Sequence, residues 1–296
     1  MLPEEVVRKI KNFEIQGSEI NRYAIESFKN FCKEHDSVKD IEEAKEMLCS
    51  AKKSDAVMQN CLNFVMQNLK NSKENLNEVA DKSIAQFLEY KNNAEKEIFK
   101  VDFIPQDAKI LIHCYSRTVI EMLKNARNRG KNFTVINTET RPNFTGRMTS
   151  KEISKYGIKN IHITDSAVAH FIRDVDFILI GCDAIDEYGI LNKIGTLNIV
   201  IIAKFYNKPV YVAVSGVKFY RADKLKNIKE MRRNREVWDK ENEEKKENAQ
   251  NLDKVEIENI AYDFIDKDLI SKVISEFGIL NFDETIEKFK EVKFCR

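Results

Sequence analysis

Two side chains that follow apolar runs could carry acid–base chemistry. Cys114 stands at the end of the run KILIHC, where polar residues begin, and Asp183 comes just after the run FILIG. A cysteine acts as a base or nucleophile through its thiolate. A carboxyl group that has lost part of its hydration holds a proton more readily, which suits it to general-acid chemistry. The structural alternatives are a small buried thiol at Cys114 and a capping carboxylate at Asp183.

Other polar residues could bind an anion. Lys193, Gly195 and Thr196 open a predicted helix, and its free backbone N–H groups beside a lysine favour a negatively charged ligand. Arg141 in the motif TETRP offers a planar guanidinium that suits phosphate, with a surface salt bridge as the alternative. Glu139 would orient that arginine or contact a sugar hydroxyl. The sequence contains neither G-x-x-x-x-G-K-[ST] nor G-x-G-x-x-G, so neither standard nucleotide-binding loop is supported.

Two further groups are interpreted as structural. Thr164, Asp165 and Ser166 precede the stretch AVAHFIRDV and are predicted to cap that helix. His113 is expected on the face of its strand opposite Cys114, because neighbouring strand residues alternate. A Cys–His nucleophile pair is therefore not expected.

Two predicted regions, one helical and one built on a sheet, would position these residues. In the first hundred residues, segments such as YAIESFKNF and NCLNFVMQNL place apolar residues three and four apart, which predicts a helical domain. From about residue 109, short and almost wholly apolar runs alternate with helical stretches. This alternation predicts a doubly wound parallel sheet covered by helices on both faces. We place the boundary between residues 1–104 and 105–296.

The predicted sheet brings the polar motifs together. Ligands of doubly wound sheets bind beyond the carboxyl ends of the strands. Four motifs follow predicted strands, and a fifth precedes an apolar helix: HCYSR, TETRP, TDSA, GCDAID and NKIGT. All five are expected to face one crevice, and this convergence supports a binding site more strongly than any single motif.

Composition excludes several classes of protein. Lysine plus arginine number 49 and aspartate plus glutamate 48, which argues against a dedicated nucleic-acid binder. No apolar stretch reaches the roughly 18 to 20 residues of a membrane span. The six cysteines are scattered without a C-x-x-C pair, so we expect a reduced, cytoplasmic protein with no metal site and no cofactor. The mixed-charge segment 221–250 is predicted to be a solvated helix or surface insertion, or alternatively a partner-docking surface.

The ordered motifs resemble a known family. HCYSR, TETRPNFTG, TDSAVAHF, GCDAID and NKIGT, followed by KPVYVAVSGVKF, are similar to motifs of the translation initiation factor 2B alpha, beta and delta subunits and the sugar-phosphate isomerases. The latter include ribose-1,5-bisphosphate isomerase, which is the most similar in catalytic residues, and methylthioribose-1-phosphate isomerase. The resemblance spans about residues 109–220. It implies a helical N-terminal domain, a Rossmann-like domain, and assembly into a homo-oligomer (dimer or hexamer) through the C-terminal domain.

The resemblance also implies a reaction. The isomerases carry a catalytic cysteine and aspartate at the positions of Cys114 and Asp183. The implied reaction is the aldose–ketose isomerisation of a 1-phosphorylated pentose, of the ribose 1,5-bisphosphate to ribulose 1,5-bisphosphate type. Asp183 would be the acid and the Cys114 thiolate the base, its pKa lowered by nearby cations. The implied substrate-binding residues are Gly17, Ser18, Lys52, Arg141, Asn192, Lys193 and Lys218.

Some residues depart from the isomerase pattern. Tyr115, Ser116 and Arg117 look more like the alpha subunits, and Gln16 and Lys52 stand where the isomerases have arginine. A lysine neutralises phosphate but lacks the bidentate fork. The alternative function is therefore a non-catalytic regulatory subunit that senses a nucleotide or sugar phosphate and binds an initiation factor. A methylthioribose-1-phosphate isomerase is a third possibility.

Overall fold

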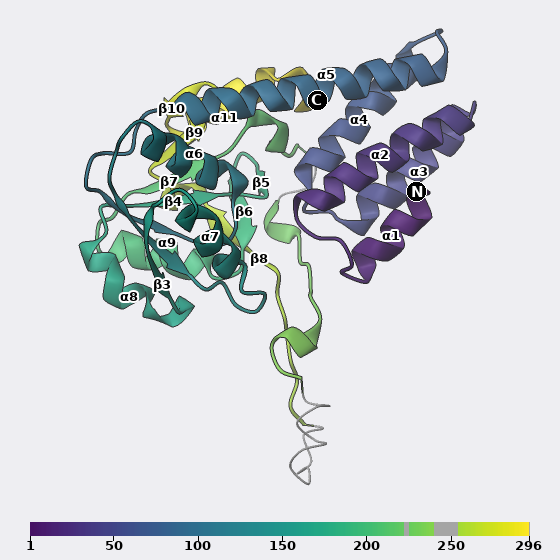
Figure 1. The fold of residues 1–296 in the computed structure, drawn as a ribbon. Coiled ribbons are helices and arrows are strands. Elements are labelled where there is room, and N and C mark those ends of the chain that lie inside the picture. Colours follow the sequence, from purple (N-terminus) through teal and green to yellow (C-terminus); the bar gives the residue numbers. More distant parts are fainter. Residues whose placement is uncertain (222–224, 240–253, 296) are drawn as a thin grey trace.

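The N-terminal region is a bundle of helices. The computed structural model describes residues 1–221, 225–239 and 254–295. Its first hundred residues form α1 (Pro3–Lys11), α2 (Ser18–Glu34), α3 (Val38–Ala51), α4 (Ala56–Asn71) and α5 (Leu76–Lys100). The apolar residues spaced three and four apart are buried in one core, which includes Phe28, Leu48, Leu62 and Phe87. The predicted helical region is confirmed (Figure 1).

Three of these helices begin at a residue that the sequence supplies as a cap. The side chains of Ser37, Asp55 and Asn75 accept hydrogen bonds from backbone N–H groups in the first turns of α3, α4 and α5. Such caps satisfy amide groups that have no partner inside the helix. The cap of α4 matters for the site described below, because Asp55 also lines a cavity.

The second region is built on a seven-stranded sheet of order β10-β9-β7-β4-β1-β2-β3. Every pairing is parallel except that of β10 with β9, as the almost wholly apolar runs predict. In register, β1 sets Ile110 opposite Val135 of β2 and Leu111 opposite Ile178 of β4. The strands are β1 (Lys109–Ile112), β2 (Thr134–Thr138), β3 (Lys159–Ile163), β4 (Phe177–Gly181), β7 (Val210–Ala213), β9 (Lys272–Ser275) and β10 (Gly278–Leu280).

Helices cover both faces of this sheet (Figure 1). One core packs the sheet against α6 and α7 and against the end of α5, through residues such as Leu123, Ile153 and Ile98. The other core holds α8 and α9 and continues into the N-terminal bundle. The covering helices are α6 (Arg117–Asn128), α7 (Thr145–Ser154), α8 (Val168–Phe171), α9 (Thr196–Phe205) and α11 (Phe282–Glu291).

A second, small sheet was not predicted. It consists of β5 (Ala184–Ile185), β6 (Gly189–Lys193) and β8 (Tyr262–Asp266), and both of its pairings are antiparallel. The motif GCDAID therefore ends one strand of the large sheet and begins the small one. Its pairing of β6 with β8 sets Lys193 opposite Tyr262 and Asn192 opposite Asp263.

The two regions are joined at the C-terminal end of the chain. The Phe294 ring contacts those of Phe64 and Phe87 in the bundle, with ring centroids 4.7 and 5.5 Å apart. The Tyr90 hydroxyl on α5 donates to Glu276 Oε1 at 2.9 Å. The chain thus returns to the helical bundle after completing the sheet, and these contacts fix the position of one region against the other. The domain boundary between residues 104 and 105 stays a prediction.

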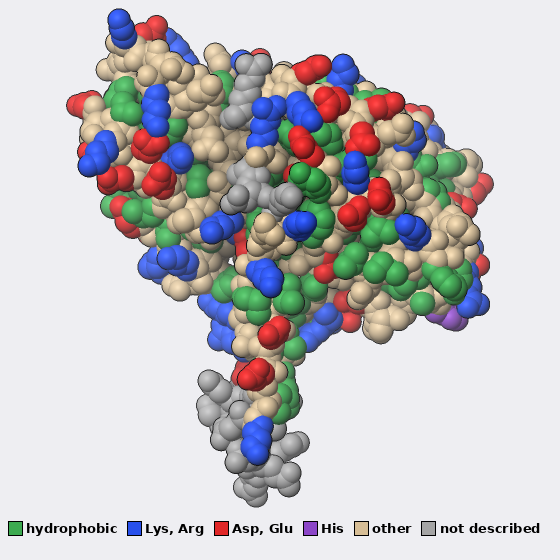
Figure 2. Space-filling view, turned by 180° about the vertical axis from the view of Figure 1, so that it is seen from behind, with side chains coloured by type: hydrophobic (Ala, Val, Ile, Leu, Met, Phe, Trp, Pro, Cys, Tyr) green, Lys and Arg blue, Asp and Glu red, His purple; other side chains and the backbone are tan. Residues whose placement is uncertain are grey.

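Residues 225–239, the main described part of the mixed-charge segment, extend away from the sheet region (Figure 1). We call residues 225–239 the strap. Its described helices are the single turns η4 (Leu225–Asn227) and η5 (Asn234–Glu236), whereas 222–224 and 240–250 of the predicted insertion lie outside the described residues. Figure 2, which views the molecule from the side opposite to Figure 1, shows positively and negatively charged side chains interspersed over its surface. The remaining short helices are η1 (Asp165–Ala167), η2 (Ile172–Asp174), η3 (Gly216–Lys218), η6 (Lys267–Leu269) and η7 (Lys293–Cys295).

Candidate active site

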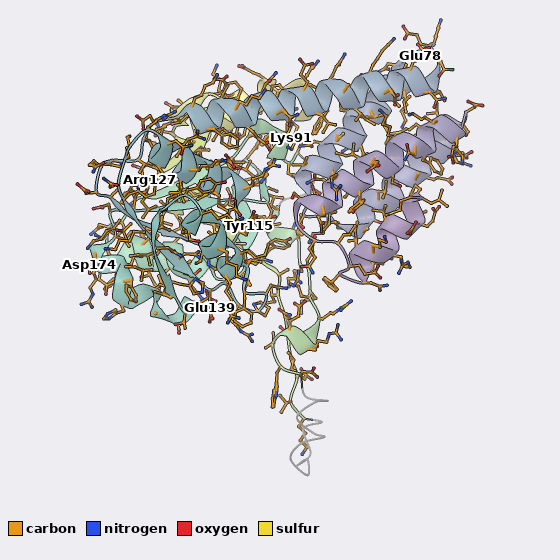
Figure 3. The ribbon with its side chains drawn as sticks, viewed as in Figure 1. Glu78, Lys91, Tyr115, Arg127, Glu139 and Asp174 are labelled. Carbon is orange, nitrogen blue, oxygen red and sulfur yellow. The ribbon has the colours of Figure 1, made fainter. Side chains whose placement is uncertain are left out.

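A large cavity of about 1730 Å³ lies where the helical bundle meets the carboxyl ends of β1 and β4. The strand order reverses between these two strands, so this is the switch point at which doubly wound sheets bind ligands. Tyr115 and Lys91 line it from the sheet region and from α5, respectively (Figure 3). The wall includes both predicted catalytic residues and all the implied substrate-binding residues except Arg141: Gly17, Ser18, Lys52, Cys114, Asp183, Asn192, Lys193 and Lys218.

Cys114 lies in a sharp turn just after β1. Its φ of 69° is unusual for a residue with a side chain, so other contacts must hold the turn. The Cys114 N–H donates to Thr140 Oγ1 at 3.0 Å, and Thr149 Oγ1 donates to the Cys114 carbonyl at 2.9 Å. The sulfur lies 3.4 Å from Thr145 Oγ1. Three threonines that follow β2 therefore fix this turn at the cavity wall.

Burial raises the pKa of the Cys114 thiol. The charge of Lys193 and the hydrogen bond with Thr145 lower this pKa, while the charge of Asp183 raises it further. Loss of hydration is the largest of these effects, because it disfavours the thiolate. The predicted lowering of this pKa is therefore wrong, although the predicted cationic neighbour, Lys193, is present.

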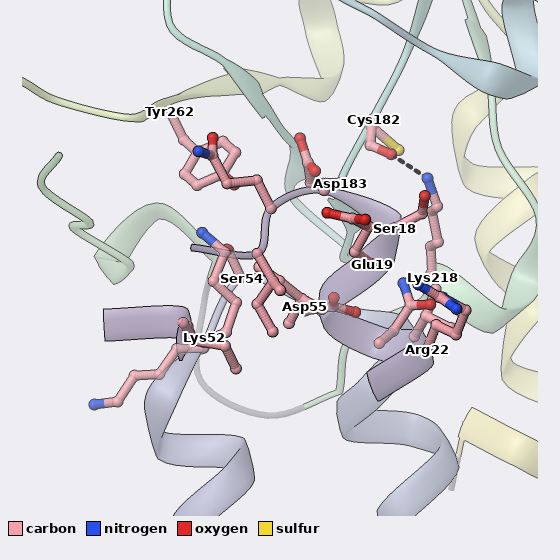
Figure 4. A pocket seen from close by; sticks show the side chains of 18 of the residues that line it. Ser18, Glu19, Arg22, Lys52, Ser54, Asp55, Cys182, Asp183, Lys218 and Tyr262 are labelled. Atoms are coloured by element: carbon pink, nitrogen blue, oxygen red, sulfur yellow. Dashed lines mark hydrogen bonds between the residues drawn. The ribbon is translucent and has the colours of Figure 1, made fainter. Parts of the chain in front are cut away.

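Asp183 also lines the cavity, two residues after the end of β4 (Figure 4). Its backbone N–H donates to Leu191 O at 2.8 Å, which turns the chain into the small sheet. Within the described part of the chain, its carboxylate caps no helix, so the capping alternative is not supported. The end of β4 approaches the Cys114 turn closely, since a Cβ on Gly181 would lie only 2.4 Å from Ser116 Oγ.

The three predicted lysines contribute positive charge to the cavity wall, which contains further lysines. Lys218 Nζ donates to the Cys182 carbonyl at 2.7 Å (Figure 4). Lys193 and Lys52 Nζ lie 5.3 and 4.7 Å from the centroid of the Tyr262 ring. A cation over the ring face is stabilised there. Burial raises the pKa of Tyr262, and the charge of Asp183 raises it further, so the phenol keeps its proton.

Asp55 is a second carboxylate in the cavity, which the sequence did not single out. Its Oδ1 accepts the Met58 N–H at 3.0 Å as the cap of α4. Burial raises the pKa of Asp55 to about 6, with the charge of Asp183 adding to the rise, while the Met58 N–H, Lys52 and Lys218 act to lower it. Tyr262 was also missed as a site residue. The segment NIAYDF is recognisable in the sequence, but only β8 pairing with β6 places its tyrosine beside Lys193.

The motif TDSA does not line the cavity. The predicted capping role of Asp165 is wrong, because its carboxylate accepts the N–H groups of Thr140 and Arg141 at 2.8 and 2.6 Å. The ends of neighbouring strands β2 and β3 bring these groups together, and the turn after β2 leaves two amides that need partners. Asp165 therefore supports the Cys114 turn indirectly, through Thr140.

The structure does not place Arg141 in the cavity wall. Its Nη2 donates to the Val237 carbonyl of the strap at 3.0 Å, and its guanidinium lies 4.9 Å from the Phe144 ring centroid. Glu139 also lies outside the cavity wall (Figure 3), where its Oε2 is 3.9 Å from Arg147 Nη2. Arg141 thus contacts the strap, and its predicted contact with a phosphate stays a prediction.

The predicted anion site at the start of α9 is filled by the protein itself. The N–H groups of Gly195 and Leu197 donate to Asp263 Oδ2 at 2.8 and 2.9 Å. A carboxylate from β8 thus takes the place predicted for a ligand. Asn192 and Lys193 still line the cavity, and Asn192 Nδ2 donates to Thr196 Oγ1 at 3.1 Å.

His113 also lines the cavity, but both of its ring nitrogens have partners within the protein. Its Nδ1 lies 2.6 Å from Thr138 Oγ1, and its Nε2 lies 2.9 Å from the Ile194 carbonyl. A carbonyl only accepts, so Nε2 carries the proton and Nδ1 accepts from the threonine. Burial lowers the pKa of His113, which keeps the ring neutral.

Two searches of the described residues were negative. No group of three or more His, Cys, Asp or Glu side chains within them is arranged to hold a metal ion. Within the same residues, no helix has the length and apolar character that a membrane span requires.

Known proteins resemble this chain along nearly its whole length. The model of the initiation factor 2 subunit family matches residues 9–282. Ribose 1,5-bisphosphate isomerase of Pyrococcus furiosus is 31% identical, over 97% of this chain and 93% of that protein. The translation initiation factor eIF2B subunit alpha of Dictyostelium discoideum is 43% identical, over 40% of this chain and 38% of its own. The crystal structure of the Pyrococcus horikoshii OT3 translation initiation factor eIF-2B has a TM-score of 0.79 and 24% identity, covering 96% of this chain and 98% of that one.

Proposed function

This chain belongs to the initiation factor 2 subunit family, and we propose that within it the protein is an isomerase of sugars phosphorylated on the anomeric oxygen. The observation that carries the proposal is the placement of Cys114 and Asp183 in the wall of one lysine-lined cavity at the switch point of the sheet. The full-length relatives named as ribose 1,5-bisphosphate isomerases support it. Ribose 1,5-bisphosphate, with ribulose 1,5-bisphosphate as product, is the first substrate to test.

The chemistry requires an acid and a base. A sugar with phosphate on its anomeric oxygen cannot open by losing a hydroxyl proton, because that proton is absent. In our proposal the Asp183 carboxyl group protonates the ring oxygen, and the bond from this oxygen to C1 breaks. The Cys114 thiolate then removes the proton from C2, which leaves an enol phosphate.

The second half of the reaction restores both groups. The Cys114 thiol returns its proton to C1, and the C2 hydroxyl gives its proton to the Asp183 carboxylate. The product is the 1-phosphorylated ketose, with thiolate and carboxylic acid regenerated. Lys193 assists by stabilising the thiolate, since its charge lowers the pKa of Cys114. In this proposal Gly17, Ser18, Lys52, Asn192, Lys193 and Lys218 hold the phosphates and hydroxyls of the sugar.

A turnover assay tests the proposal. We expect the wild-type protein to convert ribose 1,5-bisphosphate to ribulose 1,5-bisphosphate, measured by NMR of the sugar carbons. Cys114→Ser and Asp183→Asn should each reduce kcat by about 10²-fold or more. Cys49→Ser, a matched change at a half-buried thiol outside the cavity, should not. Lack of turnover by the wild type, where a known isomerase is active, would refute the proposed function.

The shorter match to an alpha subunit favours a second candidate, a non-catalytic subunit that senses a nucleotide or sugar phosphate. The raised pKa of Cys114 agrees with this candidate, because a protonated thiol is a poor base. Calorimetry that shows binding of a sugar phosphate without turnover, together with capture of an initiation factor, would favour it. The turnover assay above separates the two candidates.

Assembly through the C-terminal domain into a dimer or hexamer stays a prediction. Ile201 and Phe205 on α9 support it, because they are 52% and 78% exposed in the single chain. Light scattering after size-exclusion chromatography would measure the oligomer, and a monomer would contradict the prediction.

A further inference from the structure

One cationic position of the cavity is already occupied by a carboxylate. Lys52 Nζ forms an ion pair with Glu230 Oε2, and the Ser54 N–H donates to Glu230 Oε1 at 2.9 Å. The Lys52 and Glu230 side chains are only 16% and 19% exposed. Because the pair is largely withdrawn from water, its charges are screened far less than those of a surface pair.

The backbone of the strap holds Glu230 in this place. The Ala261 N–H, just before β8, donates to the Glu230 carbonyl at 2.9 Å. The neighbouring Arg232 N–H donates to the Asn259 carbonyl at 2.8 Å. Glu230 is therefore presented by two paired chain segments. Its reach across the cavity is a feature of the fold, unlike a chance contact of a mobile surface side chain.

The donors around the Glu230 carboxylate also suit a phosphate. They are an ammonium group on Lys52 and a backbone N–H on Ser54, both of which bind phosphate oxygens in proteins. The same residue carries a hydroxyl that could serve as a further donor, since Ser54 is 1% exposed and its Oγ has no hydrogen-bond partner within the described residues. Both oxygens of the Glu230 carboxylate accept hydrogen bonds here, one from Lys52 and one from the Ser54 N–H. A phosphate in the same place would have a third oxygen for a further donor.

Two other lysines of the cavity wall, Lys193 and Lys218, lack such a counter-charge. Neither Lys193 nor Lys218 forms an ion pair with any described residue: Lys193 lies over the Tyr262 ring, and Lys218 donates to a backbone carbonyl. The predicted lysines of the cavity wall thus differ in character. Lys193 and Lys218 are open to a substrate phosphate, whereas Lys52 is neutralised by Glu230.

We propose that Glu230 is a specificity-determining residue whose carboxylate competes with a second substrate phosphate for Lys52 and Ser54. It weakens the binding of bisphosphorylated sugars, ribose 1,5-bisphosphate included, relative to sugars with a single phosphate on the anomeric oxygen, without preventing their turnover. A second phosphate must displace this carboxylate or lie beside it, and a like charge at close range in a poorly hydrated site is costly. The inference rests on the proposed function for the identity of the ligand, but its test does not depend on turnover.

The test compares the binding of two sugars. Calorimetry with ribose 1-phosphate and ribose 1,5-bisphosphate gives Kd values for wild-type and Glu230→Gln proteins, each carrying Cys114→Ser to prevent turnover. We expect Glu230→Gln to tighten bisphosphate binding about tenfold, since a repelling charge is removed, and to leave monophosphate binding unchanged. Adding Lys52→Gln to Glu230→Gln should abolish the gain, because the second phosphate then loses its cation.

The matched control is Glu236→Gln on the same strap. Glu236 also forms an ion pair, with Arg232 at 2.8 Å, but it does not line the cavity. The proposal is overturned if bisphosphate binding does not tighten, if both sugars gain equally, if Glu236→Gln has the same effect, or if neither sugar binds any variant. Absence of turnover in the wild type, with the Kd ratio shifted as expected, would refute the proposed function alone.

Discussion

The end of β4 lies so close to the turn after β1 that Gly181 is sensitive to substitution. An added Cβ would lie 2.4 Å from Ser116 Oγ and 3.0 Å from Ser116 Cβ. Gly181→Ala must therefore push the end of β4 away from the turn after β1. Each of the two residues lies two positions from a candidate catalytic group, Asp183 and Cys114.

The size of the effect follows from this geometry. Ordinary contact begins near 3.4 Å, so the Ser116 hydroxyl has to separate from the new methyl group by 3.4 − 2.4 = 1.0 Å. A misplacement of about 1 Å costs roughly 10²-fold in rate, which is about 2.7 kcal/mol of transition-state stabilisation. The strain also destabilises the fold by about 1–3 kcal/mol. We therefore expect kcat to fall about 10²-fold with a folded protein.

A second substitution makes the reasoning refutable. Ser116→Gly removes both atoms that the new methyl group meets. Ser116 caps α6 by accepting the Val119 N–H at 3.4 Å, and a serine-to-glycine change at a cap costs only a few tenths of a kcal/mol. The double variant Gly181→Ala/Ser116→Gly should recover most of the lost kcat in the isomerase assay, with circular dichroism as the check on folding. Wild-type kcat in Gly181→Ala, or no recovery in the double variant, would refute the steric argument.

Three further predictions concern the thiol, the transferred hydrogen and the supporting loop. Because burial raises the pKa of Cys114, kcat/KM should rise with pH as the thiolate forms. Lys193→Gln removes a charge that lowers this pKa, so it should move the rising part of the pH profile to higher pH. A shift to lower pH would contradict the role of Cys114 as the base. In D2O the thiol proton taken from C2 should exchange with solvent before it reaches C1, so that the product gains deuterium at C1, detected by mass spectrometry. A product without deuterium at C1 would contradict this exchange. Asp165→Ala should lower the free energy of unfolding by about 2 kcal/mol, because the N–H groups of Thr140 and Arg141 lose their acceptor. Urea denaturation measures this change. An unchanged midpoint would count against the role of Asp165 in supporting the turn after β2.

Sequence pattern alone predicted the architecture and pointed to two candidate catalytic side chains, those of Cys114 and Asp183. Helical spacing in the first hundred residues and nearly continuous apolar runs afterwards each have one dominant structural solution. Parallel strands end at a common edge, so placing Cys114 and Asp183 after two such runs was enough to expect them in one crevice. The structure places both in the wall of the cavity.

Only the tertiary structure decided which charges remain available to a ligand. Asp263 fills the start of α9, and Arg141 turns to the strap. Glu230 reaches Lys52 across 178 positions of the chain. A local pattern reports which elements form and which faces they bury, because those depend on neighbours three or four residues away. The partner of a charge depends on the chain path between distant segments, and here that path is set by the strap and by the pairing of β6 with β8.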